Sequence, residues 1–446
     1  MTSTLISAWE KTVAAGPAAI AITDDATGLQ LTRTELDERA AAWRESHGAS
    51  LAALPVVLSE LNSITWFTAF LGLLKSKAII VPLDPGEPLA AQLSTATSIR
   101  AAWLWSGGEL RAVTPTRPRV RDARRLVKLT SGSTGTPRAL AFTDEQMLAD
   151  GRQICEGMDI QPDDINFGLI PFGHSYGLGN LVMPLLAQGT AIVCGAAAFP
   201  NAIAETVARW QPTIFPAVPA LLRALANSEV SAAQLQSLRT VISAGAPLAP
   251  EVALAFETKF GRKIHNFYGS SETGGITYDA SGDAARAGRS VGSPLPGVRL
   301  EIGRGGRFFV ESAAVFTLGN RRRSAEGLGV HRPADIGAIG ATAELTLIGR
   351  AGRFVKIAGR RLNLVEIEHA LKRIPGVRDA FVIAHAERAD ALAAAVATEH
   401  SADALRATLR ERLAAWKIPK KIVTLTAFPV TARGKTDTVR LRQLVG

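Results

Sequence analysis

Residues 130–139 read TSGSTGTPRA and directly follow the apolar run Leu126–Leu129, which is typical of a buried strand. Backbone N–H groups and hydroxyls in such a loop can surround a phosphate. The same composition is also typical of a plain surface turn. The loop does not match the P-loop ATPase motif G-x-x-x-x-G-K-[ST]. A second stretch, which ends in Gly434, Lys435 and Thr436, does not match it either, because Pro429 stands where the motif requires its first glycine. Composition alone therefore leaves both interpretations open.

Four further side chains have types suited to chemistry on anions. His174 lies in an uncharged apolar stretch, Glu272 and Asp335 lie in glycine-bearing segments, and Lys435 follows a glycine near the end of the chain. A lone histidine of this kind is more often a hydrogen-bonded core residue, and lone acids are more often solvated or cap helices. A lone lysine in a basic region is usually solvated. Their roles therefore depend on the elements that position them.

Apolar runs and segments with helical periodicity alternate along most of the chain, which predicts mainly parallel sheets covered by helices, an α/β fold. The sequence Thr143–Gln146 predicts a capping box that opens a helix. Strands are expected at 55–61, 78–83, 126–130, 191–194, 213–215 and 240–243, and helices at 65–74, 202–210 and 219–227.

The pattern of residue types along the chain changes at the polar, glycine-bearing stretch Gly349–Arg353. Beyond it the pattern predicts helices at 364–373 and 402–415, with strands at 377–383 and 422–425. We therefore expect a large domain, 1–349, and a small α+β domain, 350–446, joined at Gly349–Gly352.

Composition limits the class of protein. The chain has 446 residues, 47% of them hydrophobic, and two cysteines, Cys155 and Cys194, so a disulfide framework or a Cys-rich metal site is excluded. No signal peptide is apparent, and glycines and prolines interrupt the uncharged stretch 165–204, so we expect no membrane span and a cytoplasmic location. The last 97 residues hold 19 Lys+Arg and 9 Asp+Glu, so they carry the whole net charge of +10. No nucleic-acid-binding motif accompanies this charge, and we expect no nucleic-acid partner.

Nine stretches, in order, resemble the adenylate-forming superfamily of acyl-CoA synthetases, aryl-CoA ligases, peptide-synthetase adenylation domains and firefly luciferase. They are LLKSKAIIVPLDP (73–85), LTSGSTGTPR (129–138), PFGHSYGLG (171–179), ISAGAPL (242–248), NFYGSSETGG (266–275), SVGSPLPGVRLEI (290–302), HRPADIG (331–337), LIGRAGRFVKIAGRRLNLVEIE (347–368) and FPVTARGKTD (428–437). The resemblance implies a large adenylation domain and a small mobile lid domain. It also implies that the loop Thr130–Gly135 surrounds phosphate groups and is not a plain surface turn.

The resemblance assigns a role to each matching position. It implies that Glu272 and Thr130 bind Mg²⁺, that Tyr268 stacks near adenine, and that Asp335 and Arg350 contact the ribose or phosphate. The full set of expected nucleotide-binding residues is Thr130, Ser131, Gly132, Ser133, Thr134, Gly135, Arg138, Gly245, Ala246, Asn266, Tyr268, Gly269, Ser271, Asp335 and Arg350. Arg138 stands where the family usually has lysine, and Pro333 and Ala334 replace its usual Thr-Gly.

The same resemblance implies catalytic roles for Lys435, His174 and Glu272. The resemblance implies that Lys435 bridges the carboxylate and the α-phosphate, and that His174 positions the acid at the mouth of its pocket. The pocket residues expected are His174, Val218, Ala244, Gly274 and Gly275, and the thiol channel is expected at Lys356 and Gly359. Gly352 stands at the family's hinge position, which keeps rotation of the small domain feasible.

The function implied is ATP-dependent activation of a fatty or aryl acid, followed by transfer to the thiol of CoA or of carrier-protein phosphopantetheine. Amino acids are disfavoured, because residues 171–179 contain no acid to pair with an ammonium. The basic small domain favours an acyl or aryl carrier protein as acceptor. The alternative is a non-catalytic relative that binds adenylate or nucleotide and has a regulatory role.

Overall fold

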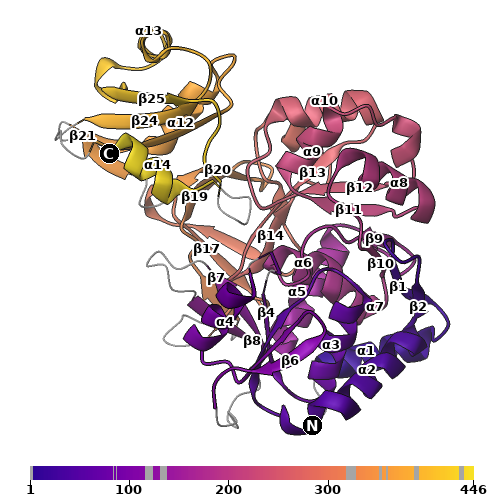
Figure 1. The fold of residues 1–446 in the computed structure, drawn as a ribbon. Helices are drawn as coiled ribbons and strands as arrows, with labels where there is room; N and C mark the ends of the chain where they lie inside the picture. Colours follow the sequence, from indigo (N-terminus) through magenta and orange to yellow (C-terminus); the bar gives the residue numbers. More distant parts are fainter. Residues whose placement is uncertain are drawn as a thin grey trace. The chain divides into compact units, whose positions relative to one another are not determined.

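The structure is a computed structural model that describes residues 4–83, 85–86, 88–115, 124–130, 138–317, 328–350, 354–357, 360–385, 391–430 and 436–446. The chain forms two compact units (Figure 1). The larger comprises Met1–Ile302, Phe309–Arg332 and Ile339–Thr346, and the smaller comprises Gly303–Phe308, Pro333–Ala338 and Leu347–Gly446. The smaller unit thus also includes two short segments before the predicted joint, and the division into 1–349 and 350–446 stays a prediction.

The larger unit contains a nine-stranded sheet whose centre is parallel. Its strands, in spatial order, are β15 (Ser293–Pro294), β14 (Gly274–Tyr278), β13 (Ile264–Ser270), β12 (Thr240–Ser243), β11 (Ile214–Ala217), β9 (Ile165–Phe167), β10 (Ala191–Cys194), β1 (Ile20–Asp24) and β2 (Gln30–Thr32). The pairs from β13 through to β1 are parallel, and β2, β14 and β15 add antiparallel edges.

A six-stranded sheet in the same unit also has a parallel centre with antiparallel edge strands. Its order is β6 (Glu109–Ala112), β5 (Trp103–Ser106), β3 (Pro55–Ser59), β4 (Ile79–Pro82), β7 (Arg124–Thr130) and β8 (Arg138–Thr143). The four central strands are parallel, whereas β6 and β8 close the edges antiparallel. The strands β3 and β4 are buried along their whole length, as expected for strands covered on both faces.

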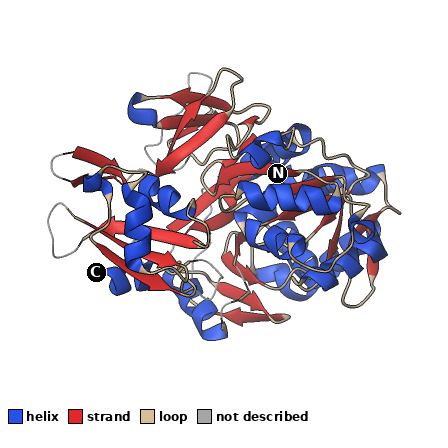
Figure 2. Cartoon of the chain, turned by 90° about the horizontal axis from the view of Figure 1, so that it is seen from above, coloured by secondary structure: helices blue, strands red, loops and turns tan. Residues whose placement is uncertain are grey.

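Helices cover these sheets (Figure 2). They are α1 (Thr4–Ala15), α2 (Arg33–His47), α3 (Ile64–Lys75), α4 (Leu89–Ser98), α5 (Asp144–Gly157), α6 (Ser175–Gly177), α7 (Met183–Gln188), α8 (Pro200–Trp210), α9 (Pro219–Ala226), α10 (Pro250–Phe260) and α11 (Asp283–Ala287). One core combines β9–β13 with α8, α9 and α10, which lie side by side in Figure 1. The predicted capping box is present, because Thr143 accepts from Gln146 N–H at 3.2 Å while the Gln146 side chain accepts from Thr143 N–H at 2.9 Å.

The next described strands along the chain, β16 to β22, form small sheets. β16 (Arg299–Ile302), β17 (Phe308–Ser312) and β18 (Gly329–His331) form one, β19 (Asp335–Ile339) and β20 (Leu345–Arg350) a second, and β21 (Phe354–Ile357) and β22 (Arg360–Asn363) a third.

The smaller unit has its own core around a three-stranded sheet. β23 (Asp379–Ala384) pairs antiparallel with β24 (Leu392–Ala397), which pairs parallel with β25 (Lys421–Leu425). Alternate residues face opposite sides of a strand. One side packs against α12 (Leu364–Lys372) and α13 (Ala402–Arg410), and the other against α14 (Thr438–Val445). The predicted helix 402–415 was too long, because α13 ends at Arg410 and only a short 3-10 turn, Ala415–Lys417, follows.

The α/β fold with a mainly parallel sheet architecture is therefore confirmed. Among the described residues, no helix is both long enough and apolar enough to cross a bilayer. Cys155 and Cys194 are both buried and free, as expected for core residues.

Candidate functional site

The hairpin β7–β8 carries the predicted phosphate loop. Thr130 ends β7, pairs with Arg138 at the start of β8, and donates its hydroxyl to the Arg138 carbonyl at 3.4 Å. Arg138 is exposed. The predicted residues Ser131, Gly132, Ser133, Thr134 and Gly135 lie outside the described part of the chain. The hairpin therefore places the two ends of the predicted loop on adjacent strands, with a hydroxyl at one end and a guanidinium at the other.

The segment that carries His174 is held by Asn62. The Asn62 amide donates to the carbonyls of Gly168 and Ile170, both at 2.8 Å, and its oxygen accepts from Phe172 N–H at 2.8 Å. The chain then turns tightly at Gly177, where a Cβ atom would lie 2.1 Å from the Pro171 carbonyl oxygen. Asn62 and Gly177 thus fix the conformation of residues 168–179, the His174 segment.

His174 is exposed and caps the short helix α6. Its Nδ1 accepts from Tyr176 N–H at 3.2 Å, so in the neutral imidazole the proton lies on Nε2. An Nε2–H group is a suitable donor to a carboxylate oxygen. A π-helical turn, Leu178–Val182, follows α6 and leads into α7, and such turns are frequent at functional sites.

A hydrogen bond joins this segment to the predicted magnesium-binding motif. The Ser175 hydroxyl donates to the Ser271 hydroxyl at 2.9 Å. Ser271 and Glu272 lie in the turn between β13 and β14, and the Glu272 carbonyl accepts from Phe316 N–H at 2.8 Å. The structure therefore brings together the two segments that contain His174 and Glu272, which lie almost 100 residues apart in the chain.

The strands β12 and β13, with the residues that follow them, supply further predicted residues of the larger unit. Tyr268 pairs with Thr277 of β14, and a β-bulge follows it at Gly269. Asn266 donates to the Ser290 carbonyl at 3.1 Å. After β12, Ala244 is buried, whereas Gly245 and Ala246 are exposed.

The predicted pocket residue Val218 lies against this stretch. A Cβ atom at Gly245, whose φ is +84°, would lie 3.8 Å from Val218 Cγ1. The Tyr176 hydroxyl lies 3.4 Å from the Ala217 carbonyl oxygen and 3.5 Å from the Ile242 carbonyl oxygen. The start of α9, the end of β12 and the His174 segment therefore meet.

Two charged side chains in this region were not predicted as site residues. Lys128 of β7 and Asp150 of α5 form a buried ion pair, with Nζ and Oδ2 3.9 Å apart. The other Asp150 oxygen accepts from Gly275 N–H at 2.8 Å. Gly274 has a φ of +71°, and a Cβ atom there would come within 2.2 Å of Asp150 Oδ1. A lysine within the apolar run 126–129 was the available signal for Lys128, whereas nothing local marked Asp150 or Asn62.

The smaller unit contains the remaining predicted residues. Asp335 begins β19 and Arg350 ends the neighbouring strand β20, so these two positions lie on paired strands. Lys356 lies in β21. The predicted residues Gly352, Gly359 and Lys435 lie outside the described residues.

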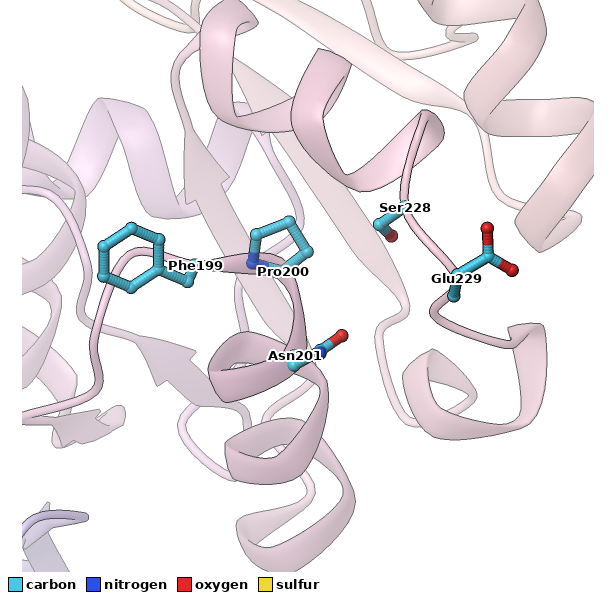
Figure 3. A pocket seen from close by; sticks show the side chains of 5 residues that line it. All are labelled: Phe199, Pro200, Asn201, Ser228 and Glu229. Atoms are coloured by element: carbon cyan, nitrogen blue, oxygen red, sulfur yellow. The ribbon is translucent and has the colours of Figure 1, made fainter.

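The pocket drawn in Figure 3 is not this site. It has a volume of about 300 Å³ and is lined by Phe199, Pro200, Asn201, Ser228 and Glu229. None of these is a predicted site residue, and they come from the start of α8 and the segment after α9 (Figure 3). The hydrogen bonds that join the motif segments, rather than this pocket, define the candidate site.

The fold is the one found in adenylate-forming enzymes. It matches the crystal structure of ATP-bound MatB from Rhodopseudomonas palustris with a TM-score of 0.85, covering 100% of this chain and 99% of that one, at 21% identity. The model of the AMP-binding enzyme family matches residues 91–305, and that of the AMP-binding enzyme C-terminal domain matches residues 366–435. The chain belongs to the adenylate-forming superfamily, as predicted.

Similar proteins carry the names of ligases. Benzoate--CoA ligase of Thauera aromatica is 28% identical over 369 residues, which are 77% of this chain and 69% of that protein. L-proline--[L-prolyl-carrier protein] ligase of Streptomyces coelicolor is 28% identical over 358 residues, which are 70% of this chain and 64% of that protein. These matches confirm the predicted reaction class, an AMP-forming acid–thiol ligase that uses ATP.

Proposed function

We propose that this chain activates an aryl carboxylic acid with ATP and transfers the acyl group to a thiol. The observation that carries the proposal is the Ser175–Ser271 hydrogen bond, 2.9 Å long, which places the His174 segment beside the motif that contains Glu272. A carboxylate and a polyphosphate must meet in such a site, and positioning them accounts for much of the catalysis. A benzoate-activating relative supports the aryl class of substrate.

The charges around the predicted pocket argue against an amino acid as substrate. The segment 171–179 contains no acidic residue. Asp150 lies behind Gly274 and Gly179, but it is already engaged by Lys128 and by Gly275 N–H. A substrate ammonium buried without its own carboxylate partner would cost several kcal/mol. A neutral ring or alkyl group carries no such cost, and fatty acids are the second class to test.

The residues present fit Mg²⁺. Among the described residues there is no cluster of three or more His, Cys, Asp or Glu side chains that could hold a metal ion. Mg²⁺ does not need one, because it is commonly bound by one or two oxygen side chains together with the substrate phosphates. The Glu272 carboxylate and the Thr130 hydroxyl are oxygen donors of this kind. When bound, the ion would neutralise charge on the phosphates.

The proposed reaction has two steps. A carboxylate oxygen attacks the α-phosphorus of ATP and pyrophosphate leaves, giving the acyl-adenylate. The thiol then attacks the acyl carbon, its proton passes to solvent or a base, and AMP leaves. We assign the Nε2–H of His174 to orienting the carboxylate, Asp335 and Arg350 to the nucleotide, and Lys435 to bridging the carboxylate and the α-phosphate in the first step.

The thiol acceptor is CoA or the phosphopantetheine of a carrier protein. The excess of positive charge after residue 349 favours a carrier protein with an acidic surface. The basic residues expected to contribute are Lys372, Arg373, Arg378, Lys417, Lys420 and Lys421. Three of them are paired within the smaller unit, namely Lys372 with Asp379, Arg378 with Glu399, and Lys417 with Glu366. Lys420 and Arg373 are exposed. The exposed basic residues of the smaller unit are called its basic face, and Lys420 represents them in the acceptor prediction.

Acid-dependent exchange of pyrophosphate into ATP tests the proposal. The panel contains benzoates, fatty acids and amino acids at equal concentration, and each active acid is then tested for thioester formation with CoA and with a holo carrier protein. We expect exchange with aryl acids to be fastest. Binding of ATP without exchange for any acid would favour the non-catalytic alternative, and a preference for amino acids would contradict the aryl assignment.

A further inference from the structure

The ion pair between Lys128 and Asp150 lies inside the larger unit. The exposed fraction of the Lys128 side chain is 2% and that of Asp150 is 3%. The Lys128 ammonium also lies 4.6 Å from the centroid of the Phe142 ring of β8. The pair therefore connects the hairpin β7–β8 to helix α5 through charged groups that water does not reach.

Asp150 contacts two of the motif segments. Its Oδ1 accepts from Gly275 N–H at 2.8 Å, three residues after Glu272. Its carboxylate also faces Gly179, where a Cβ atom would lie 3.1 Å from Oδ2. The glycines at 274 and 179 thus leave room for this carboxylate, which holds the turn after Glu272 against the end of the His174 segment.

Lys128 connects the same carboxylate to the strand that leads into the phosphate loop. Residues two apart in a strand face the same side, so Lys128 lies one pleat behind Thr130, at about 7 Å along the strand. The Lys128 ammonium pairs with the Asp150 carboxylate, which in turn accepts from Gly275 N–H, so the pair links this strand to the residues that follow Glu272.

Stability does not account for this pair. Transferring two charges into a protein interior is costly, and an apolar pair of similar volume is often as stable or more stable. Groups that hold the residues of an active site in place are, in contrast, often charged and hydrogen-bonded. The contacts of Lys128 and Asp150 run to the strand before Thr130, to Gly275 and to the vicinity of Glu272.

We propose that Lys128 and Asp150 are positioning residues for adenylation, which fix the turn that carries Glu272 relative to the strand that enters the phosphate loop. The proposal rests on the proposed function for its catalytic meaning. The pair does not touch the reacting atoms, and it acts through Glu272, Gly275 and Thr130.

The test uses the variants Lys128→Met, Asp150→Asn and the double variant Lys128→Met/Asp150→Asn. The double variant removes both charges but keeps the side-chain sizes and an acceptor for Gly275 N–H. Urea unfolding measures stability, calorimetry measures the affinity for ATP with Mg²⁺ in the absence of acid, and pyrophosphate exchange gives kcat and KM. Lys75→Met is the matched control, because it removes an ion pair of 2.8 Å with Asp37 between α2 and α3.

We expect the double variant to fold with near-normal stability but to lose about 10-fold or more in affinity for ATP and in kcat/KM for ATP, the scale for loss of an outer group that orients binding residues. Lys75→Met should leave both quantities unchanged. A double variant with normal affinity and normal kinetics overturns the proposal, because a purely structural pair would be replaced by its neutral version without loss. If Lys128→Met alone does not fold, the double variant still decides.

Failure of the proposed function gives a different result. If the wild-type chain shows no pyrophosphate exchange with any acid of the panel, the proposed function is contradicted. The affinity for ATP, measured without acid, then still separates the two outcomes for Lys128 and Asp150. Normal ATP affinity in the double variant would overturn their positioning role in that case as well.

Discussion

Asn62 binds the backbone of Phe172 directly, because its side-chain oxygen accepts from Phe172 N–H at 2.8 Å while its amide nitrogen donates to the carbonyls of Gly168 and Ile170. A single side chain from the loop before α3 therefore satisfies three backbone groups of the segment that leads to His174. Few side chains offer two donors and an acceptor in this arrangement.

We expect Asn62→Ala to weaken both stability and activity. Three backbone groups lose their partner, and an unsatisfied buried group costs about 1–3 kcal/mol, although water can reach part of this site. The free energy of unfolding should fall by about 2 kcal/mol or more, and the KM for the acid should rise because His174 loses its fixed position. Urea unfolding and exchange kinetics measure the two effects. Asn62→Asp keeps the acceptor but turns a carboxylate oxygen toward the Gly168 and Ile170 carbonyls, so it should be no more stable than Asn62→Ala. Unchanged acid KM in Asn62→Ala would contradict the link to His174.

The second prediction concerns the hydroxyl pair Ser175 and Ser271. Ser175→Ala and Ser271→Ala should each lower kcat/KM for the acid, and the double variant should lose little more than either single variant. A hydrogen bond of this kind contributes about 1 kcal/mol, so the coupling in a double-mutant cycle should be of that size. Ser46→Ala, which removes a hydroxyl bound within helix α2, is the control and should change nothing. Additive losses would mean that the two hydroxyls act independently.

The fold could be predicted from the sequence largely because periodicity is local. The strands 191–194 and 240–243 were predicted at their observed bounds, and the strand and helix around Val57 and Phe67 were predicted within a few residues. The edge strand β8, which runs back from the loop at Arg138, was not recognised, because a short strand after a Gly/Ser loop has no clear period.

The residues of the candidate site were predicted from sequence motifs, whereas the contacts between them are known only from the structure. Glu272 and His174 were proposed as site residues because motif segments contain them, and the structure adds the hydroxyl pair that joins those segments. Lys128, Asp150 and Asn62 were missed, since their partners lie between 22 and 125 residues away in the sequence. Such long-range pairs leave no mark in a local pattern.

The third prediction concerns the two buried thiols. Burial raises the pKa of Cys155 to about 12 and also raises that of Cys194. In the unfolded chain both thiols ionise near their ordinary pKa of about 8.5, so at higher pH the unfolded state binds fewer protons than the folded state. These thiols therefore destabilise the folded chain as the pH rises from about 8.5 toward 12.

We expect the free energy of unfolding to fall across that pH window, and Cys155→Ser/Cys194→Ala to show a smaller fall than the wild type. At pH 8, a thiol reagent should label neither cysteine in the native state and both after denaturation. Rapid labelling of the native protein would contradict the buried positions of these residues.

The fourth prediction tests Lys435. Lys435→Ala should lower the rate of acyl-adenylate formation by about 10²–10³-fold, the scale for the loss of one preorganised charge-stabilising group. The transfer of the acyl group from a pre-made acyl-adenylate to a thiol should change little, because the bridge between carboxylate and α-phosphate is needed only in the first step. Exchange kinetics and single-turnover thioester formation separate the two steps. Equal losses in both would remove Lys435 from the role assigned to it.

The last prediction concerns the acceptor. Lys420 is exposed on the smaller unit, whose last 97 residues carry the net charge of +10. If the acceptor is a carrier protein with an acidic surface, Lys420→Glu should slow thioester formation on the holo carrier about 3–10-fold at low salt and much less at physiological salt, since exposed charges are screened. Lys11→Glu is the matched control, because it makes the same change of net charge at an exposed position of α1 in the larger unit. Pyrophosphate exchange should be unaffected in both variants, because it does not involve the acceptor.

If Lys420→Glu and Lys11→Glu slow transfer equally, only the total charge matters and no specific basic face exists. If neither slows transfer and free CoA is the faster acceptor, then CoA is the physiological acceptor and the basic residues of the smaller unit are simply solvated.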